Sequence, residues 1–97
     1  SMTMPVEYAA IKSALLHLNK YVNAYVCDSK FRINSVSPGG IFDNQSTQFL
    51  EQYKKHTHGK GMLDVKDSVG AVIFLLSDNA RFVTDQNIIV DDGFSIK

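Results

Sequence analysis

The chain has little of several features that define other classes of protein. Only one of its 97 residues, Cys27, is a cysteine, which excludes an internal disulfide and a multi-cysteine zinc site and favours the reducing cytoplasm. Its 10 basic and 10 acidic residues cancel, so bulk charge attracts neither nucleic acid nor an anionic membrane. No apolar run reaches the roughly 18 residues of a membrane span, and no signal peptide is recognisable. We therefore expect a soluble cytoplasmic protein with no nucleic-acid or membrane partner.

A glycine-rich phosphate-binding turn is also missing. No G-x-G-x-x-G pattern occurs anywhere in the chain, although that turn is the sequence fingerprint of dinucleotide binding. With 97 residues, the chain can form one domain at most and can bury only one modest core. The sequence by itself thus carries no visible site for the pyrophosphate of a dinucleotide.

Hydrophobic periodicity predicts an α/β fold. Apolar residues recur every three or four positions over 6–28, 47–56 and 65–76, which predicts three helices. Short β-branched runs at 31–36 and 88–90 predict two strands. A strand, helices and a second strand in that order form a crossover between parallel strands.

Two parallel strands make a poor sheet by themselves. Both faces of a parallel sheet need covering, and each outer edge leaves unpaired amides and carbonyls. We therefore expect further protein to lie beside this chain, supplied by a partner or by a missing part of the same fold.

Tyr8 and Lys12 stand one helical turn apart near the start of the first predicted helix. A tyrosine hydroxyl is a weak base at neutral pH, and a lysine ammonium one turn away favours its phenolate form by opposite charge. Such a pair can serve as a general acid or base. The alternative at this point is an ordinary exposed pair on a helix surface.

Three segments, in this order and spacing, carry a family resemblance. They are residues 8–14 (YAAIKSA), 32–40 (RINSVSPGG) and 87–93 (NIIVDDG). Together they resemble the C-terminal part of a short-chain dehydrogenase/reductase. The resemblance implies part of a Rossmann-type doubly wound parallel sheet, with two parallel strands and three main helices. Residues 1–97 would then be the C-terminal segment of a single domain whose N-terminal nucleotide-binding half is absent.

The resemblance also implies roles for individual residues. Tyr8 would be the general acid or base at the substrate oxygen, and Lys12 would also hold the nicotinamide ribose of NAD or NADP. In the loop after the first strand, Pro38 would set the turn, and Gly39 and Gly40 would let the backbone approach the flat nicotinamide ring. The main chain of Ile41 would bind the nicotinamide carboxamide.

Three aspartates depart from the family pattern. Asp43 stands near a position where the family commonly has a threonine that reaches the cofactor, which puts that contact in doubt. Asp85 and Asp92 stand where the family usually has glycine. Because aspartate tolerates a left-handed backbone better than most residues, we expect both turns to survive.

Two histidines and three aromatic residues are further candidates for a metal site and for substrate contact. His56 and His58 lie two apart in a predicted loop without a third ligand at a recognisable spacing, so we expect solvated side chains and no metal site. Phe42, Phe49 and Tyr53 follow the loop where the family's substrate lid lies, and ordinary helix packing is the equal alternative.

The resemblance implies hydride transfer between nicotinamide and a small carbonyl or alcohol. Residues 4–12 (MPVEYAAIK) and 37–43 (SPGGIFD) look most like bacterial sugar-related members, including those of flagellin modification. The family's active-site serine normally precedes the tyrosine and lies ahead of residue 1, so this chain is expected to be inactive alone. The alternative is a non-enzymatic remnant that acts as an assembly module. In either case we expect a homo-oligomer or association with the missing N-terminal half.

Overall fold

A computed structural model describes residues 6–28 and 30–96 of the chain. Its main elements are α1 (Val6–Val26), β1 (Ser35–Pro38), α2 (Thr47–Lys54), α3 (Val69–Leu76) and β2 (Asn87–Val90). Three short 3-10 helices accompany them, namely η1 (Val65–Ser68), η2 (Asp78–Ala80) and η3 (Phe94–Ile96). The three helices and two strands that the sequence predicts are therefore all present.

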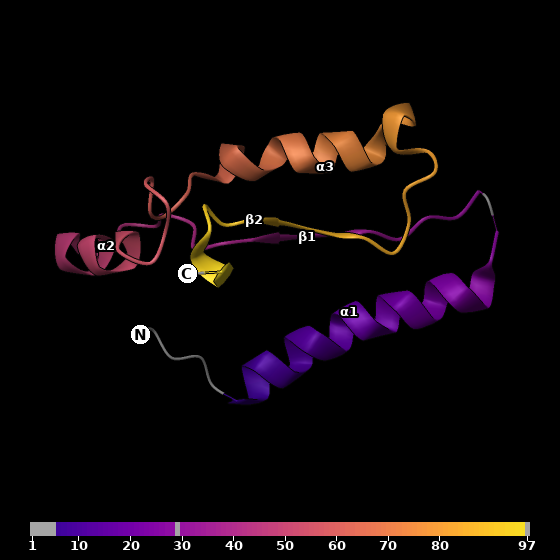
Figure 1. Cartoon of the computed structure of the whole chain (residues 1–97), viewed down its shortest axis with the longest axis horizontal. Coiled ribbons are helices and arrows are strands. Elements are labelled where there is room, and N and C mark those ends of the chain that lie inside the picture. Colours follow the sequence, from indigo (N-terminus) through magenta and orange to yellow (C-terminus); the bar gives the residue numbers. More distant parts are fainter. Residues whose placement is uncertain (1–5, 29, 97) are drawn as a thin grey trace.

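The strands form a parallel pair between two layers of helix. Ser35 lies opposite Asn87, and the register continues to Pro38 opposite Val90. α1 and α3 lie on opposite faces of this sheet, and α2 lies beyond the carboxyl ends of the strands (Figure 1). The start of α1 lies at that same end (Figure 1). The expected Rossmann-type α/β arrangement is confirmed.

The first strand begins later than predicted. The predicted strand covered 31–36, whereas ladder pairing starts at Ser35. Before it, side chains replace the ladder: Asn34 Nδ2 donates to the Val83 carbonyl at 2.9 Å, and the Ile33 amide donates to Thr84 Oγ1 at 3.3 Å. Such side-chain partners leave no signal in hydrophobic periodicity.

Helix ends follow local chemistry. α1 stops at Val26 because Cys27 adopts a left-handed backbone (φ 45°), a common way for a helix to end. The Ser46 hydroxyl accepts a hydrogen bond from the Phe49 amide at 3.2 Å and so caps the start of α2. None of the helices formed by the described residues is both long and apolar enough to cross a membrane.

The core of the described residues is small. Its buried apolar side chains are Tyr53, Leu63, Leu75 and Ala80. α1 buries no residue at all, and Ile89 of β2 remains 54% exposed, although an apolar strand in a parallel sheet predicts burial on both faces. The described residues therefore leave apolar surface on both α1 and the sheet that they do not cover themselves.

Gly70 in α3 differs from expectation. A glycine inside a helix costs up to about 1 kcal/mol relative to alanine, so close packing on a neighbour was expected there. In the structure, apart from its chain neighbours and the backbone of its own helix, no described atom lies within 4 Å of the place where its side chain would begin. Packing among the described residues does not require this glycine.

Candidate active site

Tyr8 and Lys12 lie together on the first half of α1. The Lys12 ammonium nitrogen lies 5.5 Å from the centre of the Tyr8 ring, and Tyr8 is 50% exposed. The Tyr8 hydroxyl makes no hydrogen bond to any described residue. The pair is therefore presented on one side of the helix, with the phenol available to a bound molecule.

A cavity joins this part of α1 to the first strand. It has a volume of about 350 Å³, and its lining includes Lys12 and Ser13 on the helix and Ser35 and Ser37 on β1. Because β1 runs directly into the loop 38–41, the cavity places Lys12 on the same side of the molecule as that loop. Lys12 and the last residues of β1 before that loop thus border one cavity.

The loop after β1 turns the N–H and C=O of Ile41 outward. Ile41 forms an isolated parallel bridge with Leu63, in which the Leu63 amide donates to the Gly40 carbonyl and the Phe42 amide donates to the Leu63 carbonyl, both at 2.8 Å. This pattern directs the N–H and C=O of Ile41 away from Leu63. The Ile41 carbonyl receives only a 3.4 Å contact from Gln45 Nε2. The Ile41 N–H has no hydrogen-bond partner in the part of the chain that the structure describes.

The two glycines of the loop are required by protein packing. A Cβ atom at Gly39 would lie 2.8 Å from Asp91 Cβ, and one at Gly40 would lie 2.8 Å from the Tyr53 ring and hydroxyl. Real Cβ contacts essentially never come that close. Packing against Asp91 and Tyr53 is thus one reason for glycine at these two positions, and the expected approach of the backbone to a flat ring stays a prediction.

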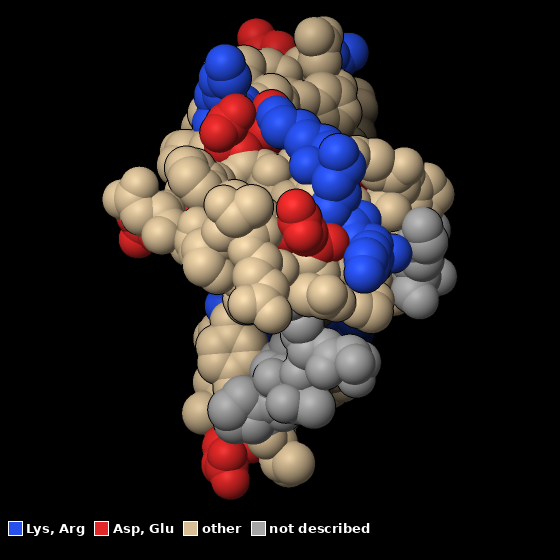
Figure 2. Space-filling model, turned by 90° about the vertical axis from the view of Figure 1, so that its left-hand side faces the viewer, with Lys and Arg blue, Asp and Glu red and all other residues tan. Residues whose placement is uncertain are grey.

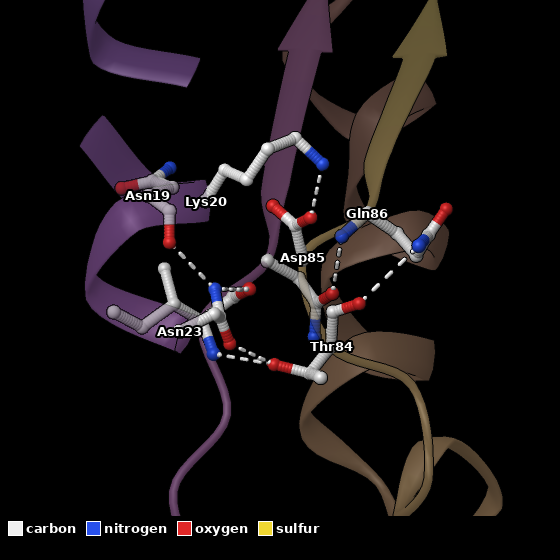
Figure 3. A network of polar contacts seen from close by, with 8 residues as sticks. Asn19, Lys20, Asn23, Thr84, Asp85 and Gln86 are labelled. Atoms are coloured by element: carbon white, nitrogen blue, oxygen red, sulfur yellow. Dashed lines mark hydrogen bonds and ion pairs between the residues drawn. The ribbon is translucent and has the colours of Figure 1, made fainter. Parts of the chain in front are cut away.

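A polar network joins α1 to the segments that precede the two strands, at their amino ends (Figure 3). Lys20 Nζ lies 2.5 Å from Asp85 Oδ2, and the Thr84 hydroxyl donates to Asn23 Oδ1. Asn23 Nδ2 also donates to the Ile33 carbonyl at 3.2 Å. Sequence reasoning missed this network, although amides at Asn19 and Asn23, four apart on one helix face, were the available signal.

Both unusual aspartates have the left-handed backbone that was expected. Their φ angles are 60° at Asp85 and 52° at Asp92, so the prediction that aspartate supports these turns is confirmed. The Asp92 carboxylate also accepts hydrogen bonds from the amides of Lys60 at 2.5 Å, Gly59 at 3.1 Å and Gly61 at 3.3 Å. The Asp92 carboxylate therefore ties the loop after α2 to the C-terminal turn by bonds that a glycine could not make, in addition to the bond from the His58 amide to the Asp92 carbonyl at 2.7 Å.

These bonds make the stability of the loop depend on pH. The Lys60 amide first, and then those of Gly59 and Gly61, hold the pKa of the Asp92 carboxyl below its usual value. A lowered folded-state pKa contributes stability above the unfolded value, about 3.9, and that contribution is lost as pH falls through the folded value.

We expect Asp92→Asn, which keeps a residue suited to positive φ, to reduce the loss of melting temperature on acidification below about pH 4. An unchanged pH profile in thermal melts would contradict this.

The remaining candidate residues take ordinary roles. Asp43 is exposed, and its amide donates to Gln45 Oε1 at 2.6 Å. Tyr53 is turned inward, so its helix-packing alternative holds. The His56 ring meets the edge of Phe94 with centroids 5.8 Å apart. Among the described residues, no group of three or more His, Cys, Asp or Glu side chains could hold a metal ion.

Charges of both signs share the end of the molecule that carries α2. Figure 2 shows a band of basic side chains across this face with acidic groups beside it. Lys60 pairs with Asp64 at 3.5 Å and with Asp67. This face therefore offers mixed charge, in line with the zero net charge of the whole chain.

The fold and site define a class. A parallel α/β/α layer arrangement, with a Tyr–Lys pair one turn apart at the start of α1, matches part of a Rossmann-type fold. A family model described as enoyl-(acyl carrier protein) reductase matches residues 2–95. The chain belongs to the short-chain dehydrogenase/reductase family.

Individual relatives agree with this assignment. The post-translational flagellin modification protein A of Campylobacter coli is 42% identical over 96 residues, covering 99% of this chain and 38% of that protein. A short-chain dehydrogenase from Leptospira borgpetersenii with bound NAD+ matches with a TM-score of 0.88 at 40% identity, covering 96% of this chain and 37% of that one. 4-Hydroxyisoleucine dehydrogenase complexed with NADH and succinate matches with a TM-score of 0.85 at 30% identity, covering 99% and 42%. The chain thus spans well under half the length of these relatives.

Proposed function

We propose that these residues form the C-terminal part of an NAD(P)-dependent oxidoreductase that acts on a carbonyl or alcohol. The observation that carries the proposal is the exposed Tyr8–Lys12 pair, whose Lys12 borders one cavity with the end of β1. In this proposal residues 1–97 belong to a single domain that needs an N-terminal nucleotide-binding half, from the same polypeptide or from a partner chain. The single cysteine favours a cytoplasmic location for it.

The residues fit a nicotinamide cofactor by their donor set. The N–H and C=O of Ile41 offer an adjacent donor and acceptor, which match the two hydrogen-bonding ends of a carboxamide. The Lys12 ammonium would hold the ribose hydroxyls. When bound, the nicotinamide ring supplies or accepts the hydride.

Tyr8 would be the general acid or base at the substrate oxygen. In reduction its hydroxyl would donate a proton to the carbonyl oxygen, and in oxidation its phenolate would accept the proton of the alcohol. The resemblance of residues 4–12 and 37–43 to bacterial sugar-related members of the family supports a sugar-related substrate, and the similarity to flagellin modification protein A supports a role in flagellin modification.

Cofactor binding tests the proposal directly. We expect the complete protein to bind NADH or NADPH with micromolar affinity in isothermal titration calorimetry. The 97-residue chain is expected to show no such binding, because it contains no glycine-rich turn for the pyrophosphate. Micromolar binding by the 97-residue chain would contradict the second expectation, and no binding by the complete protein would overturn the proposed function.

A second candidate function is a non-enzymatic assembly module. It is supported by the exposed apolar face of α1, formed by Ile11, Leu15, Leu18 and Tyr21. Both candidates use this face for association with a second copy or with the N-terminal half. Measurement of turnover distinguishes the two candidates: an assembly module would keep its association and show no turnover of a carbonyl with NAD(P)H or of an alcohol with NAD(P)+.

A further inference from the structure

Tyr53 is the residue of α2 that reaches the loop after β1. It is only 7% exposed, whereas Phe49 in the same helix is 40% exposed. The Tyr53 phenol oxygen accepts a hydrogen bond from the Gly40 amide at 2.6 Å. The proposed function uses the next residue, Ile41, and so far gives Tyr53 no part in cofactor binding.

Aromatic packing fixes where this phenol oxygen lies. The Tyr53 ring stacks on Phe94 with centroids 4.5 Å apart and planes at 16°. The Phe49 ring also stacks on Tyr53, with centroids 6.3 Å apart and planes at 26°. Offset stacking of this kind restricts ring motion and adds to the energy of burial. The hydroxyl is therefore held by α2 and by the C-terminal turn together.

The hydrogen bonds of Gly40 determine the direction of the Ile41 amide. Tyr53 holds the Gly40 N–H, and the Leu63 amide holds the Gly40 carbonyl at 2.8 Å. Because a trans peptide is planar, the Ile41 N–H points opposite to the Gly40 carbonyl. The peptide on each side of Gly40 is thus fixed by one hydrogen bond. The 2.8 Å approach of a Gly40 Cβ to the Tyr53 hydroxyl shows how closely the two residues fit.

We propose that Tyr53 is a positioning residue for the nicotinamide end of the cofactor site. By holding Gly40, it keeps the N–H and C=O of Ile41 facing the carboxamide. This inference rests on the proposed function. The alternative is that Tyr53 only fills the small core beside Leu63, in which case its hydroxyl has no effect specific to the nicotinamide.

Tyr53→Phe tests the hydroxyl because it keeps the stacked ring. Calorimetry on the complete protein would compare NADH with ADP-ribose, which lacks the nicotinamide. Loss of one hydrogen bond that leaves a donor unpaired is expected to weaken NADH binding about tenfold and to change ADP-ribose binding by less than about twofold. Tyr25→Phe is the matched control, since Tyr25 is 80% exposed, and both affinities should stay at their original values.

Hydrogen exchange gives a readout without cofactor. The Gly40 amide is expected to be protected in the original protein and to exchange faster in Tyr53→Phe, whereas the Leu63 amide keeps its protection. Equal weakening of NADH and ADP-ribose binding, or no weakening of either, would overturn the inference. A protein that binds ADP-ribose and NADH equally before any substitution would overturn the nicotinamide site at Ile41, and this inference with it.

Phe94→Leu covers the case in which Tyr53→Phe does not fold. It leaves the hydroxyl in place and removes the ring that supports it. The expected result is a smaller loss, about threefold, again confined to NADH. A Phe94→Leu protein that binds NADH and ADP-ribose as the original does would then overturn the inference.

Discussion

Replacing Tyr8 by phenylalanine is expected to lower turnover of the complete enzyme by about 100- to 10,000-fold. The substitution removes only the hydroxyl, which makes no hydrogen bond to any described residue and is free to meet a substrate oxygen. Because the ring contact with the Lys12 ammonium at 5.5 Å can remain, NADH affinity should change little. Steady-state kinetics and calorimetry on the same preparation would measure both quantities.

A matched substitution shows whether the effect belongs to this hydroxyl. Tyr25→Phe removes a phenol from the same helix, on a side chain that is 80% exposed, and should leave turnover within about twofold, since surface changes have small effects. Lys12→Ala should weaken cofactor binding and turnover together. A Tyr8→Phe enzyme that retains near-normal turnover would remove the proton-transfer role assigned here.

Much of the fold could be predicted from the sequence because it depends on periodicity. Apolar spacing of three and four predicted α1, and its observed range, Val6–Val26, lies within the predicted 6–28. The aspartates at positions 85 and 92 were expected to adopt positive φ, and they do. These features depend on residues close together in the chain, which the sequence displays directly.

The tertiary contacts of the loop could not be predicted in the same way. The hydrogen bond from the Gly40 amide to the Tyr53 hydroxyl joins residues 13 apart in the sequence. The Ile41–Leu63 bridge joins residues that lie on either side of α2 and the predicted loop after it. Nothing in the spacing of Gly39 and Gly40 indicated that their neighbours would be Asp91 and Tyr53. Such contacts depend on how α2 folds back onto the strand ends, and hydrophobic periodicity does not specify that direction.

The second prediction with a large expected effect concerns the apolar face of α1 and the assembly state of the complete protein. Ile11, Leu15, Leu18 and Tyr21 are between 50% and 65% exposed, and with Ala14 and His17 they border a shallow depression of about 500 Å³. Burying a leucine side chain contributes about 1.5–3 kcal/mol. A contiguous apolar patch of this kind marks an association surface. We therefore expect the complete protein to sediment as a dimer or larger assembly at micromolar concentration.

Replacing both Leu15 and Leu18 by glutamate should convert that assembly to monomers. Glutamate is a good helix former, so α1 should persist in circular dichroism, while two charges on the face would have to be buried without partners for the contact to survive. Val65→Glu is the control: Val65 is 69% exposed in η1, outside this face, and its sedimentation should match that of the original protein. A monomeric original protein that melts cooperatively would show that the face is covered within one chain, and a double variant that still associates would place the contact elsewhere.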